Sequence, residues 1–166
     1  RTEPLDSQQV YRLDPERIWA PDRWVTRQYH LPARRLSDKF LYSSYALPLT
    51  LLAGRRSRED FGKVGLMTLQ TLLLNTATTH LTKVVVRRTR PFVYNPGVPM
   101  PDKLRKNARY SFFSGHASNT ASMSFLTASL IQNFYPNSDI RYVAWPLAIT
   151  IPAVTGYLRM RAGKHF

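Results

Sequence analysis

Cysteine is absent from this chain of 166 residues, and acidic residues are scarce. Without cysteine the chain can form neither disulfides nor thiolate metal sites, although this leaves its cellular compartment open. Between Asp60 and Asp139 the only carboxylate side chain is that of Asp102. The clusters of carboxylates that hold Mg²⁺ are therefore missing from this part of the sequence. We expect the protein to need no metal ion and no other cofactor.

The shortage of acidic residues leaves a large excess of positive charge. The chain has 24 Lys and Arg but only 10 Asp and Glu, which gives a formal net charge of +14 at pH 7. Such a charge predicts an anionic partner, and nucleic acid, a membrane surface and a phosphorylated substrate all fit. With 43% hydrophobic and 12% aromatic residues, the chain is too apolar for a disordered basic tail. Its length suffices for one domain with a sizeable core.

Two regions of different composition divide the chain. Residues 1–39 are polar and aromatic, and we expect short helices there, one opening at Asp14, where Asp can cap and Pro15 fits the first turn. The aromatic side chains of this region fit either a membrane interface or packing onto a core. Residues 40–166 contain runs without Asp, Glu, Lys or Arg, namely 40–54, 64–82, 110–138 and 142–158. Four long helices joined by polar loops predict an all-α helical bundle.

The composition of these runs leaves their relation to a membrane open. A membrane span needs roughly 20 mostly apolar residues, and several of the runs are rich in Thr, Ser and Asn, as in a soluble bundle. The basic loop 54–58 resembles a positively charged cytoplasmic loop. We expect a membrane-embedded bundle, with a soluble bundle as the alternative.

A basic cluster lies at the end of the second run. Pro91 disfavours helical backbone at Arg90, so the helix is expected to end at or just before that residue. Lys83 then lies in the last turns, and a spacing of seven residues lets Lys83 and Arg90 point into one space. A lysine point charge and an arginine fork suit phosphate oxygens. The helix macrodipole alone would also attract cations to this end, and it accounts for Arg87 and Arg88 well.

Histidines lie in two further segments. The triplet Ser114–His116 precedes a predicted helix, whose free N–H groups would bind phosphate. Arg159 follows the run 142–158, and Gly163 is a suitable left-handed terminator for its helix. His165 can then fold back across the helix end, although Lys164 and His165 taken alone read as a solvated tail.

In chain order the three segments read K-x6-R-P, S-G-H and R-x3-G-x-H. This pattern resembles the type 2 phosphatidic acid phosphatase superfamily, which also includes bacterial acid phosphatases and vanadium haloperoxidases. The residues that match the family motifs K-x6-R-P, P-S-G-H and S-R-x5-H-x3-D are Lys83, Arg90, Pro91, Ser114, Gly115, His116, Arg159 and His165. Phe113 stands in place of the proline of the second motif, and Leu158 in place of the serine of the third.

The resemblance leaves the aspartate of the third motif without a match. This residue orients the nucleophilic histidine in the family, and it would fall three residues after Phe166. We expect the helical phosphatase core, residues 40–166, to be truncated at its C-terminus. A non-catalytic scaffold of the same fold is the alternative if the aspartate is missing.

The resemblance also implies a mechanism. His165 would attack phosphorus and form a phosphohistidine, and His116 would protonate the leaving oxygen and later activate water. The charge of the phosphoryl group would be neutralised without a metal. The phosphate-binding residues would be Lys83, Arg90, Ser114, Gly115 and Arg159.

The expected function is therefore hydrolysis of a lipid phosphate or diphosphate at a membrane. The expected location is the bacterial inner membrane, with the active site facing the periplasm. The same fold would also serve a soluble periplasmic acid phosphatase or a vanadium haloperoxidase. A basic nucleic-acid-binding module fits the charge, but it does not explain cations placed at helix ends with fixed spacing, and we expect no nucleic-acid partner.

Overall fold

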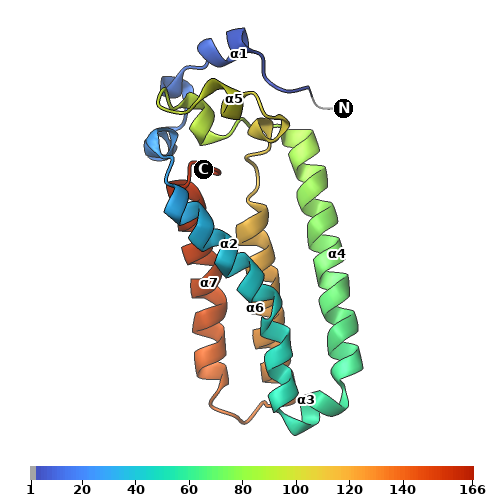
Figure 1. The fold of residues 1–166 in the computed structure, drawn as a ribbon. Coiled ribbons are helices and arrows are strands. Elements are labelled where there is room, and N and C mark those ends of the chain that lie inside the picture. Colours follow the sequence, from blue (N-terminus) through green and yellow to red (C-terminus); the bar gives the residue numbers. More distant parts are fainter. Residues whose placement is uncertain (1–2) are drawn as a thin grey trace. The chain divides into compact units, whose positions relative to one another are not determined.

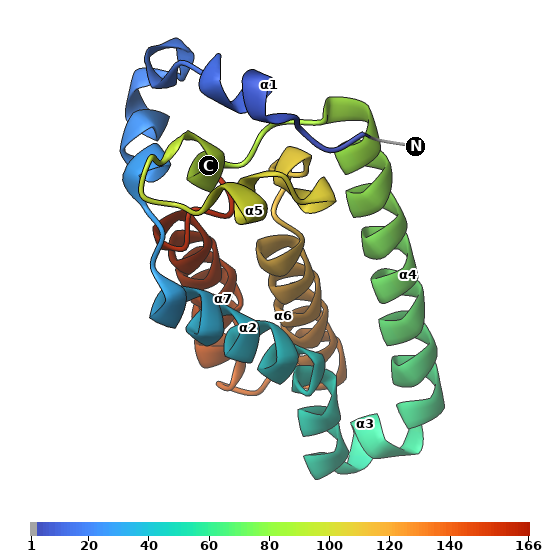
Figure 2. The ribbon, with the colours of Figure 1, turned by 45° about the horizontal axis from the view of Figure 1, so that its top comes forward.

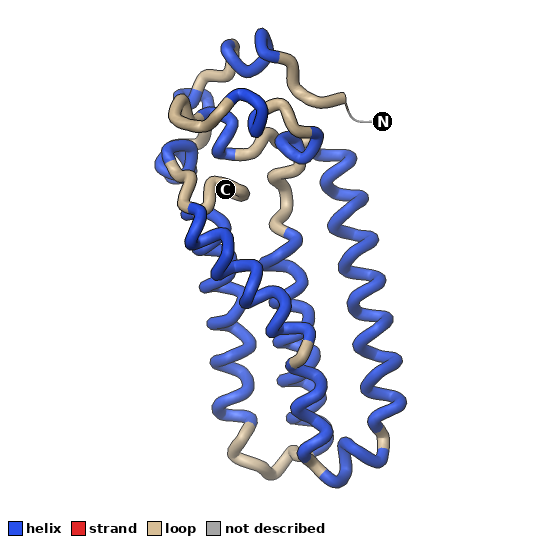
Figure 3. Tube along the Cα trace, in the orientation of Figure 1, coloured by secondary structure: helices blue, strands red, loops and turns tan. Residues whose placement is uncertain are grey.

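A computed structural model describes residues 3–166, which form helices, turns and loops without a strand (Figure 3). The predicted all-α class is confirmed for these residues. The first two residues of the predicted segment 1–39 lie outside the described part of the chain. The long helices are α2 (Leu31–Tyr45), α4 (Phe61–Val86), α6 (Gly115–Phe134) and α7 (Arg141–Arg161), labelled in Figure 1.

Short helices connect the long ones. The short α-helices are α1 (Ser7–Tyr11), α3 (Arg55–Glu59) and α5 (Met100–Lys103). The 3₁₀ helices are η1 (Pro15–Arg17), η2 (Ala20–Arg27), η3 (Leu47–Ala53), η4 (Pro91–Tyr94) and η5 (Lys106–Arg109). Three of the four predicted runs coincide with α4, α6 and α7. The first run does not form one helix, because α2 begins earlier and ends at Tyr45, and Pro48 lies at the start of η3.

The contacts of the chain divide it into two compact units. The first unit comprises residues 3–36, Thr79–Ser114 and Gly156–Phe166, and the second comprises Ser37–Thr78 and Gly115–Thr155. Each unit therefore combines stretches that are distant in the sequence.

The first unit has an apolar core formed by loop and short-helix residues. Its buried members are Leu5, Val10, Phe92, Val93, Val98 and Ala108. Tyr29 packs on this core, with its ring centroid 6.2 Å from that of Phe92. Tyr11 and Trp19, by contrast, are exposed. The aromatic residues of the N-terminal segment thus divide between core packing and exposure.

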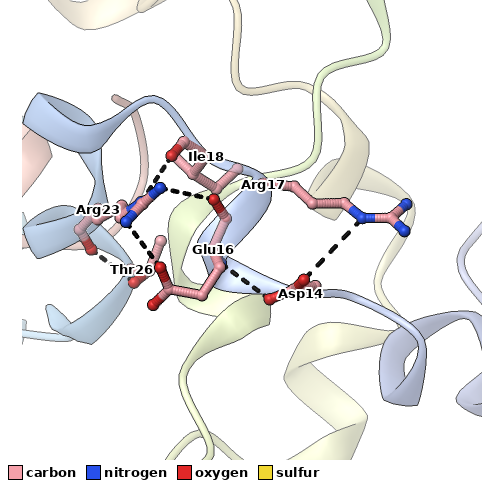
Figure 4. Close-up of polar contacts among 6 residues, drawn as sticks. All are labelled: Asp14, Glu16, Arg17, Ile18, Arg23 and Thr26. Atoms are coloured by element: carbon pink, nitrogen blue, oxygen red, sulfur yellow. Dashed lines mark hydrogen bonds and ion pairs between the residues drawn. The ribbon is translucent and has the colours of Figure 1, made fainter.

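Polar contacts stabilise the chain between η1 and η2, as Figure 4 shows. The Asp14 carboxylate accepts a hydrogen bond from the backbone N–H of Glu16 at 2.9 Å, which confirms the helix start predicted at Asp14. Arg23 donates to the Glu16 carboxylate at 2.7 Å and to the carbonyl of Ile18 at 2.8 Å. These contacts hold η1 and η2 together and so fix the backbone just before Gln28 and Tyr29.

In the second unit α6 and α7 lie side by side, as Figures 1 and 2 show. The indole N–H of Trp145 on α7 donates to the side-chain carbonyl of Gln132 on α6 at 2.6 Å, and the rings of Trp145 and Phe125 also pack together. A second cluster of buried apolar residues contains Leu51, Val64 and Leu130. The unit therefore has a core of its own.

Helix α4 presents many apolar side chains to the exterior. Leu69, Leu73 and Leu74 are 53%, 61% and 69% exposed. Nevertheless, none of the helices formed by residues 3–166 combines the length and the apolar composition needed to cross a membrane. The transmembrane helices expected from the sequence are thus not supported.

Candidate active site

Three backbone hydrogen bonds join the motif segments within the first unit. The N–H of Arg90 donates to the carbonyl of Ala108 at 2.8 Å, and the N–H of Ser111 donates to the carbonyl of Arg88 at 2.8 Å. The N–H of Phe92 donates to the carbonyl of Gly163 at 2.9 Å. The segment after α4, the segment before α6 and the segment after α7 are therefore fixed against one another.

The end of α4 places two cations of the first motif. The helix ends at Val86, with Lys83 in its last turn, and Arg90 is extended before Pro91, as predicted. Arg90 is 9% exposed and Lys83 is half-buried. Burial, and then the charges of Arg90 and Arg159, lower the pKa of Lys83. Lys83, Arg90 and Arg159 thus lie close enough for their charges to act on one another.

The neighbouring arginines of this stretch behave differently. Arg88 forms an ion pair with Asp22 at 3.0 Å. Arg87 is exposed, and its side chain donates to the carbonyl of Val84 within the helix end. Neither arginine has the buried environment of Arg90. The general explanation by the macrodipole suits these two residues and does not explain Arg90.

The chain turns sharply after α7, so that residues 163–165 are buried in the first unit. Gly163 has φ +65°, and the N–H groups of Gly163 and Lys164 donate to the carbonyls of Met160 and Arg159 at 2.9 and 3.0 Å. This is the Schellman pattern of helix termination. A Cβ atom at position 163 would lie 2.2 Å from the carbonyl oxygen of Gln28, so the position requires glycine. The predicted terminator is confirmed, and His165 follows it as a buried residue.

His165 is held in one tautomer by a backbone carbonyl. Its side chain is 3% exposed, and its Nδ1 atom lies 2.5 Å from the carbonyl oxygen of Ser111. A carbonyl oxygen can only accept a hydrogen bond, so Nδ1 must carry the proton. Nε2 of the neutral ring then keeps its lone pair. This arrangement prepares Nε2 to act as a nucleophile.

The electrostatic environment keeps His165 neutral. Burial, followed by the charges of Arg90 and Arg159, lowers the pKa of His165 well below 6.5, against an opposing effect of the Ser111 hydrogen bond. Burial also lowers the pKa of Arg90 to about 10, with Arg159 and Arg34 contributing. No carboxylate among the described residues forms an ion pair with Lys83 or Arg90. Buried cations without anionic partners are costly, and a bound anion would compensate them.

His116 lies in the second unit, at the start of α6. The helix begins at Gly115, directly after Ser114, so Gly115 and His116 lie in its first turn and do not precede it. Nε2 of His116 lies 2.7 Å from a carboxylate oxygen of Asp38, which belongs to α2. This contact joins residues 78 positions apart. Nothing in the sequence near Asp38 indicated it.

The structure thus brings together only part of the predicted site within one unit. Lys83, Arg90, Arg159 and His165 lie in the first unit, which also includes Ser114. Gly115 and His116 belong to the second unit. Sequence reasoning missed Ser111, which acts through its backbone carbonyl, and Asp38. No group of three or more His, Asp or Glu suited to a metal ion occurs among residues 3–166, and independence of metals stays a prediction.

This chain belongs to the PAP2 superfamily, because a sequence model of that superfamily matches residues 65–166. The match covers every motif residue and confirms the resemblance to type 2 phosphatidic acid phosphatases. Neither a curated protein nor a solved structure matched the chain in our comparisons. Membership indicates phosphatase chemistry in general. Asp38 and Arg34 lie outside the matched residues.

Proposed function

We propose that the protein is a phosphatase that hydrolyses a phosphorylated lipid through a phosphohistidine on His165. The observation that carries this proposal is the environment of His165. The ring is buried and neutral, its Nδ1–H donates to the carbonyl of Ser111, and the positive charges of Arg90, Arg159 and Lys83 act on it. A tetrahedral dianion supplies the charge that this cluster lacks, and its phosphorus is the electrophile that Nε2 requires.

In the first step Nε2 of His165 forms a bond to phosphorus, and the bond between phosphorus and the leaving oxygen breaks. Lys83, Arg90 and Arg159 stabilise the charge of the phosphoryl oxygens, which is where most of the catalysis of phosphoryl transfer arises. The family motif assigns further hydrogen bonds to Ser114 and to the N–H of Gly115.

His116 acts as the general acid in the first step and as the general base in the second. It donates a proton to the leaving oxygen and then accepts one from the water that attacks the phosphohistidine. The bond between Nε2 and phosphorus breaks in the second step, and inorganic phosphate is released. Asp38 holds Nε2 of His116 at 2.7 Å. A carboxylate in this position orients the ring, because it can only accept a hydrogen bond from Nε2.

Two features of the second unit support a lipid as the substrate. An apolar cavity of about 220 Å³ lies between η3, α6 and α7, lined by residues such as Leu47, Ile131 and Leu147. The exposed leucines of α4 form an apolar surface of the kind that binds membranes or other apolar partners. We therefore propose membrane association at the bacterial inner membrane, with the site on the periplasmic side.

The first test measures phosphate release from dodecyl phosphate in detergent micelles and from p-nitrophenyl phosphate in solution. We expect turnover of both substrates in the parent protein and almost none in His165→Ala. Unchanged turnover in the His165→Ala variant would contradict the proposal.

The second test concerns the apolar surface. The double variant Leu69→Gln and Leu73→Gln should bind phosphatidylglycerol vesicles more weakly and hydrolyse lipid phosphate more slowly. It should keep its activity on p-nitrophenyl phosphate. Tyr11→Gln is the control, because Tyr11 is also an exposed apolar side chain but belongs to the first unit. Vesicle binding that is the same in all variants would contradict membrane association through α4.

A further inference from the structure

A polar cavity of about 220 Å³ adjoins the cationic cluster of the first unit. Its lining includes Tyr29, Arg34, Asp102, Arg105, Asn107 and Lys164. Lys164 directly precedes His165, and Phe92, which also lines the cavity, follows Arg90 by two residues. Pockets that enclose a whole ligand usually measure about 300–1,000 Å³. This cavity suits a small polar group of a larger molecule.

Lys164 presents an unbalanced charge to this cavity. The residue is 8% exposed, and its ammonium lies 4.2 Å from the centre of the Phe92 ring. Among residues 3–166 the ammonium has no hydrogen bond or ion pair. Burial, and then the charges of Arg90, Arg34 and Arg159, lower the pKa of Lys164 to about 8, against an opposing effect of Asp102. A buried ammonium without an anionic partner is costly, so the cavity favours an anion.

The single carboxylate of the cavity is already engaged. One oxygen of Asp102 accepts a hydrogen bond from the hydroxyl of Tyr29 at 3.1 Å, and the other forms an ion pair with Arg105 at 2.9 Å. Asp102 therefore offsets Arg105 more than it offsets Lys164. Arg34 adds positive charge, since it lowers the pKa of both Arg90 and Lys164.

We propose that this cavity binds the second phosphoryl group of a diphosphate substrate whose terminal phosphoryl group is transferred to His165. This inference rests on the proposed phosphatase function and specifies its substrate. Nε2 of His165 forms a bond to the terminal phosphorus, and the bond from that phosphorus to the bridging oxygen breaks. The electron pair stays on the bridging oxygen, which leaves as part of a monophosphate. Lys164 and Arg34 stabilise the negative charge of this leaving group.

The experiment compares dodecyl diphosphate with dodecyl monophosphate in the same detergent micelles. The quantity measured is the ratio of kcat/KM for the diphosphate to kcat/KM for the monophosphate. Lys164→Met keeps the apolar stem and removes the charge, and the ratio should fall at least about tenfold, as expected for loss of a charged hydrogen bond. Lys106→Met is the control, because Lys106 is exposed on η5 and does not line the cavity. This control should leave the ratio unchanged.

Asp102→Asn gives an opposite expectation. The amide keeps the shape of the side chain and removes the negative charge, so the ratio should rise. A ratio that is unchanged in Lys164→Met, or that falls in Asp102→Asn, would overturn the inference while the phosphatase function stands. Failure of the parent protein to hydrolyse either substrate would instead overturn the proposed function.

Binding can be measured apart from turnover. Methylenediphosphonate, which resists hydrolysis, should raise the Tm of the parent protein more than inorganic phosphate does at equal concentration. Lys164→Met should abolish this difference. Equal stabilisation by the two anions would show that the protein binds single phosphate ions without a second subsite, which contradicts the inference.

Discussion

Replacing Arg90 by lysine keeps the positive charge of the site but removes the planar guanidinium fork. Arg90 is 9% exposed and has no carboxylate partner among the described residues, so its donors are available to a phosphoryl group. Its Nε atom is buried without a hydrogen bond in the described structure. A bidentate contact becomes a single contact in Arg90→Lys. One hydrogen bond to a charged group contributes about 1.5–3 kcal/mol.

This free energy corresponds to a fall in kcat/KM of about 10- to 150-fold, since about 1.4 kcal/mol is a factor of ten. The assay is steady-state phosphate release from p-nitrophenyl phosphate, with Tm measured to confirm folding. Arg87→Lys is the control, because Arg87 is exposed and contacts only its own helix end. It should retain activity within about twofold. Equal losses in the two variants would refute the assignment of Arg90 as the phosphate clamp.

Four further outcomes are expected. Activity should persist in excess EDTA and be inhibited by vanadate, whereas loss in EDTA with rescue by Mg²⁺ would contradict a metal-free mechanism. His116→Ala should still show a burst of p-nitrophenol in rapid-quench experiments, followed by slow turnover, whereas His165→Ala should show none. The reverse result would exchange the two roles. Asp38→Asn should slow hydrolysis of dodecyl phosphate about tenfold more than that of p-nitrophenyl phosphate, because the general acid His116 loses the carboxylate that orients it. Equal losses on the two substrates would show that Asp38 has only a structural role. The free energy of unfolding should fall as pH falls through about 6.5, because the pKa of His165 is lowered in the folded state and the unfolded state binds the extra proton. Urea titrations should show a smaller pH dependence in His165→Gln, and an identical dependence would count against a buried neutral His165.

The helix ends around the site could be predicted because local chemistry determines them. Pro91 ends the helical region before Arg90, and Gly163 provides the left-handed residue after α7. The start of α2 could not be predicted in this way, because the helix contains charged residues. Its exposed face carries Arg34, Arg35 and Lys39, whereas Ala33 and Ser37 are buried. An amphipathic helix carries charged residues on its exposed face and buries only the opposite face. A search for runs without charged residues therefore does not find it.

Some residues of the site could be predicted from the sequence, and others could not. The side chains that bear charge or a nucleophile could be found from motif spacing. The carbonyl of Ser111 could not, because its role depends on a backbone position next to His165 and not on the identity of its side chain. Asp38 reaches His116 across 78 positions, which only the fold determines. The sequence predicted that Lys164 belongs to a solvated tail, whereas the residue is buried.

The membrane expectation rested on runs without charged residues, and such runs can still contain many polar side chains. The absence of charged residues from a run does not make the run apolar enough to span a bilayer. Helix α4 contains Gln70, Asn75 and His80 among its leucines and threonines. The side-chain amide of Asn75 donates to the side-chain oxygen of Asn119 on α6 at 3.0 Å.

The most direct test of the account is to trap the phosphoenzyme and find the residue that carries the phosphoryl group. The protein is mixed with ³²P-labelled p-nitrophenyl phosphate, denatured in alkali within milliseconds, digested and sequenced by mass spectrometry. The account predicts an acid-labile, alkali-stable phosphoryl group on His165 that accumulates in His116→Ala and is absent from His165→Ala. A label on any other residue, or phosphate release without a labelled intermediate in His116→Ala, would contradict it.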